Sequence, residues 1–399
     1  MRAAERGAKG ASAGDQSGPE KGFQADRVAT IAAGHVVHDT YTSFLPPLLP
    51  RFIADLSLSR TEAGVLTVFM QVPSLLQPLI GHLADRVSLR YLVILAPAAT
   101  GAMMSLLGVA SDYALLALLL VAAGLSSAGF HAVAPAMTGR LSGAKLGRGL
   151  GFWMIGGEIG RALGPIVIVT ALVHLKPPET PYLMLGGLLA TIFLYIRLRD
   201  VRVHASARPQ SPGLGAALRH MRPLMVPLIG IVVVRGFMMA SLTIFLPTFL
   251  TDEGAGLWLA GAALTLLEAA GVAGALLGGW TSDRLGRRPV LLACLLASPV
   301  FMFVFLGVEG WAQFAVLLVL GVTLLGVAPV ALALVQEHFP ENRALASGLY
   351  MSMSFMVRSL AVVVLGLVGD LFGLRLAFAG SALLMLLGVP LVFLLPRGR

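Results

Sequence analysis

The chain has 399 residues, of which 57% are hydrophobic and 12% are charged, and its mean hydropathy is +0.85. A soluble globular domain carries about 25% charged residues, so this composition indicates a membrane protein. The net charge of +9 does not indicate a nucleic-acid partner, because the basic residues are interspersed between apolar runs. The single cysteine, Cys294, excludes a disulfide framework and a thiolate metal site.

The chain begins with 26 residues rich in Gly, Ala, Ser and mixed charges, where we expect a disordered cytoplasmic tail. This segment has no apolar core, so we do not expect a signal peptide. A membrane-spanning helix needs about 20 apolar residues. That requirement predicts twelve spans, at residues 27–50, 61–83, 91–110, 113–138, 149–173, 181–197, 223–250, 257–280, 289–308, 311–337, 345–369 and 374–396.

Lys and Arg residues in the loops predict how the chain crosses the membrane. With the N-terminus in the cytoplasm, the cytoplasmic loops hold fifteen of these residues and the outer loops hold four. The four outer residues are Arg51, Arg60, Lys176 and Arg375. We therefore expect a multi-pass protein of a bacterial inner membrane, with both termini in the cytoplasm.

The first span contains ionisable residues within the segment GHVVHDTYTSFLPPLLP, residues 34–50. Asp39 lies roughly 18 Å along the helix at about 1.5 Å per residue, close to the bilayer centre. His35 shares its face, whereas His38 is turned about 100° away and is expected to face a neighbouring helix. Ionisable residues inside a membrane mark pathways or relays, and a low dielectric disfavours the charged form of a carboxyl group. We expect Asp39 to carry a proton with His35 as partner; a static hydrogen bond between spans is the alternative.

Two loops share the pattern G-x-x-x-D-R-x-x-x-R: GHLADRVSLR at 81–90 and GWTSDRLGRR at 279–288. The pattern resembles the cytoplasmic-loop signature of the major facilitator superfamily, which usually has Gly where Ser88 stands. Each Gly permits close helix approach, each Asp can cap a helix N-terminus, and each Arg adds cytoplasmic charge. The resemblance implies a gating role for Gly81, Asp85, Arg86, Arg90, Gly279, Asp283, Arg284 and Arg288.

The fifth span contains GGEIGRALGP at 156–165. Gly156, Gly160 and Gly164 are four residues apart, so they line one helix face and favour tight packing against a neighbour. Pro165 adds a point of weakness for rocking. This segment resembles the antiporter motif of drug–proton exchangers in the superfamily, although two apolar residues follow the Pro where that motif has two glycines.

Glu158 and Arg161 in the same span are three residues apart, so we expect them to pair. The pair is either purely structural or opened by a proton or an anionic substrate that competes for one member.

The loop at 198–222 divides the spans into two sets of six, and the sets are duplicates. FLPPLL at 44–49 corresponds to FLPTFL at 245–250, and Gly124 and Gly129 correspond to Gly321 and Gly326. Parallel repeats place a substrate site between the halves near the bilayer midplane. We predict an all-α membrane protein with twelve transmembrane helices in two six-helix bundles, at 27–197 and 223–396, joined by a cytoplasmic linker at 198–222.

The second half supplies Arg235, Glu268 and Arg358, in spans seven, eight and eleven. The repeat brings these residues into register with His35, Gln71 and Arg161, respectively. We therefore predict one central cavity. The expected proton-coupling residues are Asp39, His35, Glu158, Glu268 and His131, and the expected substrate-binding residues are Arg161, Arg235, Arg358, Gln71 and Tyr41.

The first-span segment together with GFHAVAP in the fourth span is similar to the fosmidomycin-resistance family of the superfamily. That family has a comparable first span and a Phe–His pair in the fourth, usually followed by Pro where Ala132 stands. The resemblance rests on His35, Asp39, Tyr41, Pro46, Pro50, Phe130 and His131. It implies export of drugs or small anionic metabolites, driven by inward proton flow.

We expect a monomeric secondary transporter in the lipid bilayer that moves a small-molecule substrate and protons by alternating access. The alternatives are a proton symporter that imports a sugar or an organic acid, and a transporter of lysolipids or other amphiphiles. We expect no enzyme, no cofactor and no ATP drive, because H-E-x-x-H, a G-x-S-x-G triad and a Walker motif do not stand out. We also expect no metal, with a site made of His35, Asp39 and His131 as the alternative.

Overall fold

The computed structural model describes residues 23–77, 79–80, 89–143, 146–201, 214–339 and 343–395, and the regular structure within these ranges is helical. Most of the expected tail, at 1–22, lies outside the described residues. The N-terminal group of helices comprises α1 (Ala25–Thr42), α2 (Leu45–Leu56), α3 (Arg60–Gln71), η1 (Val72–Leu76), α5 (Arg90–Leu106), η2 (Leu107–Val109), α6 (Tyr113–Leu141), α7 (Leu146–His174), η4 (Pro177–Leu183) and α8 (Met184–Leu198).

The C-terminal group begins with α9 (Leu214–Ala240), so residues 214–222 of the expected linker are helical, and Pro223 and Pro227 lie inside the helix. The polar residues at 219–222 gave this segment the composition of a loop. The group continues with η5 (Ser241–Phe245), α10 (Leu246–Asp252), α11 (Leu257–Leu285), α12 (Arg287–Gly307), α13 (Trp311–Leu325), α14 (Val327–His338), α15 (Arg343–Phe372), α16 (Leu374–Leu386) and α17 (Gly388–Leu394).

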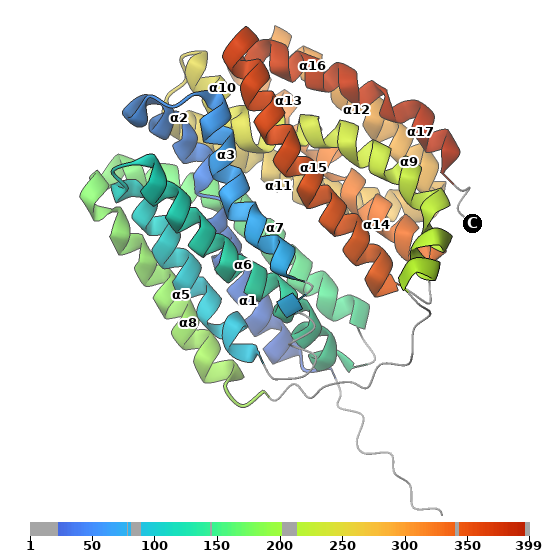
Figure 1. The fold of residues 1–399 in the computed structure, drawn as a ribbon, viewed down its shortest axis with the longest axis horizontal. Coiled ribbons are helices and arrows are strands. Elements are labelled where there is room, and N and C mark those ends of the chain that lie inside the picture. The colour runs from blue at the N-terminus through green and yellow to red at the C-terminus, as the bar shows by residue number, and fades with distance from the viewer. Residues whose placement is uncertain are drawn as a thin grey trace, which may run out of the picture.

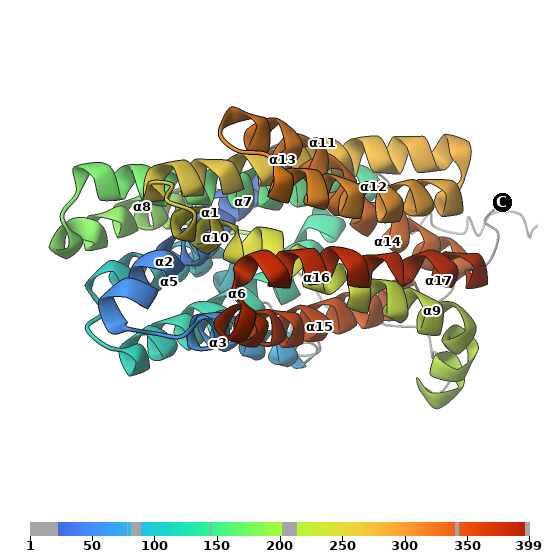
Figure 2. The same cartoon turned by 90° about the horizontal axis from the view of Figure 1, so that it is seen from above.

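The two groups of helices lie side by side, and their helices run along nearly one common direction (Figures 1 and 2). In the N-terminal group, α1 packs against α5, α6, α7 and α8. In the C-terminal group, α9 packs against α15, α16 and α17, and α11 packs against α13 and α14. The groups meet chiefly where α3 packs against α15 and α7 against α11. This arrangement confirms the predicted fold class of an all-helical membrane protein built from two bundles.

The repeated FLPPLL and FLPTFL segments interrupt a helix in each group. Between α1 and α2 the chain turns at Ser43 and Phe44, and Pro46 and Pro47 follow in the first turn of α2. In the second copy, the π-helix η5 joins α9 to α10, which has Pro247 in its first turn. Proline has no backbone N–H to continue the helical ladder, so both breaks follow from the sequence.

Ten helical stretches within the described residues are long and apolar enough to cross a membrane, and they correspond to the third to twelfth predicted spans. The first predicted span is divided at the α1–α2 turn, and its α1 half carries His35, His38 and Asp39. The second predicted span changes from α3 to the 3₁₀-helix η1 at Val72, next to Pro73. The count of twelve therefore stays a prediction.

Two physical expectations for the second loop motif are wrong. A Cβ at Gly279 would meet no atom within 4 Å, so this glycine does not mediate close helix approach. The close approach of α11 to α13 occurs at Gly274, where a Cβ would lie 2.6 Å from Val322 Cα. Asp283 in the last turn of α11 does not cap a neighbouring helix but pairs at 2.7 Å with Arg287, the first residue of α12, across the turn at Gly286.

Candidate functional site

Glycines of α7 bring this helix against α1. A Cβ at Gly160 would lie 2.9 Å from Asp39 Cβ and 3.0 Å from the backbone nitrogen of Thr40. Gly156 and Gly164, one turn to either side, face the backbone of α1 in the same way. Each of these positions excludes a larger side chain, and the predicted packing face is confirmed.

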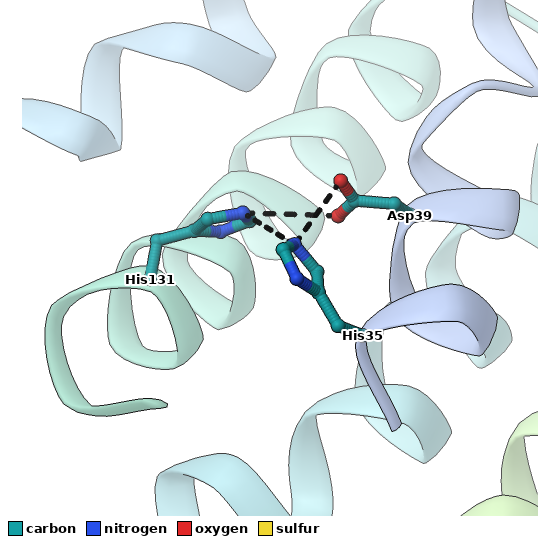
Figure 3. Close-up of side chains that lie close together, drawn as sticks. All are labelled: His35, Asp39 and His131. Atoms are coloured by element: carbon teal, nitrogen blue, oxygen red, sulfur yellow. Dashed lines mark hydrogen bonds and ion pairs between the residues drawn. The ribbon is translucent and has the colours of Figure 1, made fainter. Parts of the chain in front are cut away.

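Asp39 is the centre of a buried polar cluster (Figure 3). Its Oδ2 atom lies 3.3 Å from Nε2 of His35 and 3.5 Å from Nη1 of Arg161. Its Oδ1 atom lies 2.9 Å from Nδ1 of His38 and 3.8 Å from Nε2 of His131. Asp39 and His35 are each 3% exposed, and His38 is fully buried. The cluster therefore gathers groups from α1, α6 and α7 around one carboxylate.

Backbone carbonyls orient two of the imidazole rings. Nδ1 of His35 lies 2.8 Å from the carbonyl oxygen of Trp153, and Nδ1 of His131 lies 3.0 Å from that of Ser127. A carbonyl oxygen only accepts hydrogen bonds, so each Nδ1 carries a proton and donates it. In the neutral rings the lone pairs are then on Nε2, and these two atoms approach each other to 3.3 Å beside Asp39. Three electron-rich groups converge at one point.

His38 faces the neighbouring helix α6, as the sequence predicted, and it also belongs to this cluster. Its ring stacks on Phe130 of α6 with a centroid distance of 4.6 Å, and its Nδ1 reaches the carboxylate of Asp39. Helical angles describe the directions of Cα–Cβ bonds, whereas the imidazole is long enough to fold back to an adjacent residue. The sequence signal for this contact was that His38 and Asp39 are adjacent in the chain.

The predicted pair of Glu158 and Arg161 is present as an ion pair on α7. Arg161 also reaches Asp39, so it lies between two carboxylates. Its side chain is 36% exposed, compared with 5% for the side chain of Asp39, so the guanidinium is the accessible member. Its electrostatic neighbours in the other group are Glu268 of α11 and Arg358 of α15.

Glu268 lies on α11 at the interface between the groups and is 7% exposed. Its electrostatic neighbours are Arg161, Glu158 and Arg358. Arg358 of α15 donates from Nη2 to the hydroxyl of Thr243 at 3.0 Å. The structure thus brings Asp39, Arg161, Glu268 and Arg358 into one network of charges that crosses from α7 to α11 and α15.

Arg235 is an electrostatic neighbour of Arg358, but its hydrogen bonds go to another part of the C-terminal group. Its Nε and Nη2 atoms donate to the carbonyl oxygen of Leu324, at 3.0 and 2.9 Å. That carbonyl belongs to the last turn of α13, which has no helical partner for it because α13 ends there. Arg235 therefore completes a helix end inside the C-terminal group.

Two further residues of the predicted substrate set have specific partners. The carbonyl of the Gln71 side chain accepts from the hydroxyl of Ser359 at 3.0 Å, which joins α3 to α15 beside Arg358. The hydroxyl of Tyr41 donates to the carbonyl of Leu183 at 2.5 Å and accepts from the backbone of Gly187 at 2.9 Å. Tyr41 thus ties α1 to the start of α8 within the N-terminal group.

The gating residues of the first loop, Gly81, Asp85 and Arg86, lie outside the described residues. Arg90 donates to the carbonyl of Val201 at 3.3 Å, and Arg288 donates to that of Phe393 at 3.1 Å. The guanidinium of Arg284 lies 3.7 Å from the ring centroid of Trp280. The Arg90 contact joins α5 to the chain just after α8, the Arg288 contact joins α12 to α17, and the Arg284 contact lies within α11.

His35, Asp39 and His131 also have the composition of a metal site. Each offers one ligand atom, and these atoms lie within 4.8 Å of one another. Imidazole nitrogen and carboxylate oxygen are common donors to divalent transition metals.

The fold, with charged residues buried where its two bundles meet, defines a membrane transporter. Residues 31–280 and 259–399 match the Major Facilitator Superfamily, and the chain belongs to this family. It is therefore a multi-pass transporter that acts on small molecules, and not an enzyme.

The chain is 25% identical over 374 residues to the fosmidomycin resistance protein of Escherichia coli strain K12, with 92% of each chain covered. It is 26% identical over 380 residues to the MFS-type transporter YfnC of Bacillus subtilis strain 168, again with 92% of each covered. These matches support the resemblance to the fosmidomycin-resistance family.

Solved transporters share the fold. A bacterial homologue of the human lysosomal transporter Spinster superposes with a TM-score of 0.79 at 14% identity, covering 93% of this chain and 96% of that one. A D-xylose–proton symporter superposes with a TM-score of 0.72 at 16% identity, covering 93% and 97%.

Proposed function

We propose that this protein exports small anionic molecules, fosmidomycin among them, in exchange for protons that flow inward. The likeness to the fosmidomycin resistance protein over nearly the whole chain supports the substrate class. The α7 glycine face, which resembles the motif of drug–proton exchangers, supports exchange rather than symport. The charge bias of the loops supports a bacterial inner-membrane location with both termini in the cytoplasm.

The substrate-binding groups in this proposal are Arg161 and Arg358. They come from opposite helix groups, and both are electrostatic neighbours of Glu268. An anion between the groups would be held by guanidinium groups, which form strong charge-assisted hydrogen bonds with phosphonate and carboxylate oxygens. Gln71 adds an amide beside Arg358 through Ser359.

The observation that carries proton coupling is the environment of Glu268, a carboxyl group that is 7% exposed at the interface between the bundles. Burial in a low dielectric penalises a carboxylate, so an adjacent positive charge or a proton is needed to offset its charge. In this proposal ionised Glu268 draws Arg161 and Arg358 to the interface, where the anion binds between them, whereas protonated Glu268 leaves Arg161 to Glu158 and Asp39. Proton and anion then compete for the same network, and each shifts the transporter between states by its differential affinity.

The sequence also assigned Glu158, Asp39, His35 and His131 to the proton path. Glu158 remains in the proposal, because it shares Arg161 with Glu268. The role of the other three stays a prediction, and their geometry supports a different ligand, described in the next section.

Transport by purified protein in proteoliposomes tests the exchange. Vesicles loaded with radiolabelled fosmidomycin are diluted into acidic buffer, so that protons are driven inward. We expect efflux to be accelerated, and a protonophore to remove the acceleration. Retention or accumulation of the drug under the same gradient would contradict exchange and favour symport. Glu309→Gln, an exposed loop residue, is the matched control for Glu268→Gln, which is expected to lose the acceleration.

A further inference from the structure

Ring nitrogens of His35 and His131 and the carboxylate of Asp39 lie at spacings close to those of ligands around one metal ion. Nε2 of His35 lies 3.3 Å from Nε2 of His131 and 3.3 Å from Oδ2 of Asp39, and Nε2 of His131 lies 3.8 Å from Oδ1. A four-coordinate ion with bonds of about 2.0–2.1 Å separates neighbouring ligand atoms by about 3.3–3.4 Å. The two spacings of Nε2 of His35 match this value, and the 3.8 Å spacing from Nε2 of His131 to Asp39 is longer, so a small side-chain movement would complete the set (Figure 3).

The hydrogen bonds around these ligands also fit a metal site. A metal-binding histidine usually donates its other ring N–H to a carbonyl or a carboxylate, which fixes the tautomer and the ring orientation. His35 does so to Trp153 at 2.8 Å, and His131 does so to Ser127 at 3.0 Å. His38 supports the third ligand, because its Nδ1 lies 2.9 Å from Oδ1 of Asp39.

The surrounding rings hold the ligands in place. His35 stacks on Trp153 with a centroid distance of 4.4 Å, and His38 stacks on Phe130 at 4.6 Å. Gly157 of α7 leaves the space that the site occupies, since a Cβ there would lie 2.7 Å from Nε2 of His35. The site is thus built before any ligand arrives, which lowers the cost of binding.

We propose that His35, Asp39 and His131 bind a late first-row divalent cation such as Zn²⁺ or Co²⁺. Two neutral imidazoles and one carboxylate satisfy the donor preference of these ions. Three protein ligands leave a fourth position for water or for an oxygen of an anionic substrate. The side chain of His131 is 26% exposed, so this position is reached from its side, near Arg161.

The cation site would give the transporter a second positive group for an anion, next to Arg161. This part of the inference rests on the proposed anionic substrate, whereas cation binding itself does not. Glu268 is not a ligand, so Glu268→Gln is expected to retain the cation while it loses proton coupling. The two proposals can therefore fail separately.

Titration of the full-length, chelator-treated protein in detergent with Co²⁺ tests the site directly. We expect the visible ligand-field bands of four-coordinate Co²⁺, and their loss when Zn²⁺ is added in competition. His131→Ala and the shape-conserving Asp39→Asn should each weaken Co²⁺ binding by at least about tenfold. His174→Ala, which removes an exposed histidine at the end of α7, is the matched control and should bind like the wild type.

Absence of the bands in folded wild-type protein would overturn the proposal, and would leave a proton as the species that offsets the charge of Asp39. Bands retained at full affinity in both His131→Ala and Asp39→Asn would place the cation elsewhere and would also overturn it. If the wild type binds Co²⁺ at this site, inorganic phosphate or fosmidomycin should shift its bands. Unchanged bands would reject the open fourth position while the cation site itself stands.

Discussion

Gly157 shows at the scale of one residue how tightly the Asp39 cluster is built. A Cβ at this position would lie 2.5 Å from Cε1 of His35 and 3.1 Å from Oδ2 of Asp39. These atoms are held by stacking and hydrogen bonds, so they cannot move away without breaking the cluster.

We expect Gly157→Ala to lower the free energy of unfolding by about 1–3 kcal/mol, as overpacking usually does. Gly151→Ala on the same helix is the control, because a Cβ there meets no atom within 4 Å. That substitution should be neutral, or stabilising by up to about 1 kcal/mol. Denaturant titration of both variants in detergent measures the difference, and equal stability would contradict the packing described for the cluster.

Arg235 and Arg358 are both half-buried arginines of the C-terminal group, and we expect opposite effects when each is substituted. Arg358→Gln should weaken fosmidomycin binding by about 10- to 100-fold, because a charge-assisted hydrogen bond contributes about 1.5–3 kcal/mol. Arg235→Gln should leave affinity unchanged and lower thermal stability, since it removes the donors to Leu324. Calorimetric titration and thermal unfolding separate the two effects. Loss of affinity in Arg235→Gln alone would reverse these assignments.

Single residues were predictable where the helical period decides their position. His35 and Asp39 share a face because they are four apart, and the structure joins them at 3.3 Å. Repeat register placed Arg235 in the central cavity, and this stays a prediction, because register does not fix a rotamer and the guanidinium donates to the carbonyl of Leu324. The contact of His35 with Trp153, 118 residues away, depends on helix packing that a single sequence does not encode visibly.

Close packing at the scale of helices comes from glycines in both groups. In α11, a Cβ at Gly274 would lie 2.6 Å from Cα and 2.8 Å from C of Val322, so α13 would have to move. Gly279, five residues later, has open space around its Cα.

Gly274→Ala should therefore destabilise the protein, whereas Gly279→Ala should leave its melting temperature unchanged. Both substitutions remove the same glycine flexibility from one helix, so the comparison isolates the contact with α13. A melting temperature that falls equally in both variants would contradict the packing found here. Transport by Gly279→Ala additionally tests the gating role that the loop resemblance implies.

Helix boundaries were predictable from proline and polarity, with informative failures. The FLPPLL repeat marks a break between α1 and α2, and the FLPTFL repeat marks a π-helical turn within the continuous helical stretch Arg219–Asp252, because Pro46 and Pro247 cannot donate to the preceding turn. The start of α9 was placed at residue 223, nine residues late, since basic residues before it resemble a loop. Apolar packing along the rest of the helix overrides that local signal.

A polar latch joins the two groups at the end of the molecule where α3 begins. The carboxylate of Asp370, at the end of α15, accepts from the backbone N–H groups of Arg60 and Thr61 at 2.6 and 2.9 Å, and from the Thr61 hydroxyl at 2.5 Å. Arg60 also pairs with Asp252 of α10 at 2.7 Å. Free N–H groups and the dipole of a helix N-terminus favour such a carboxylate. The charge bias predicts that this is the outer side.

Because outward opening must separate α3 from α15, Asp370→Ala should favour the opened state. The side chains of Thr170 on α7 and Trp258 on α11 hydrogen-bond at 3.1 Å. Cysteines placed at these two positions should therefore cross-link in the closed state, in a Cys294→Ser background that removes the native cysteine. If the latch contributes about 1.4 kcal/mol to the closed state, Asp370→Ala should lower the ratio of closed to open protein by about tenfold.

Asp112→Ala is the matched control for the latch. Asp112 caps α6 by accepting from Leu115 at 2.9 Å, and this hydrogen bond, followed by that from Ser111, lowers the pKa of the Asp112 carboxyl. Its cap joins residues of one group only, so cross-linking should stay at the wild-type level. Equal yields for Asp370→Ala and Asp112→Ala would show that the latch does not hold this end closed.

The most direct measurement for the whole account is proton release on substrate binding. Purified wild-type protein in weakly buffered detergent solution should release protons when fosmidomycin is added, because in this proposal the anion binds the form in which ionised Glu268 holds Arg161 and Arg358 at the interface. Glu268→Gln should bind the drug without that release, and Glu309→Gln should match the wild type. Proton release that persists unchanged in Glu268→Gln, or proton uptake by the wild type, would contradict competition between anion and proton at the interface of the two bundles.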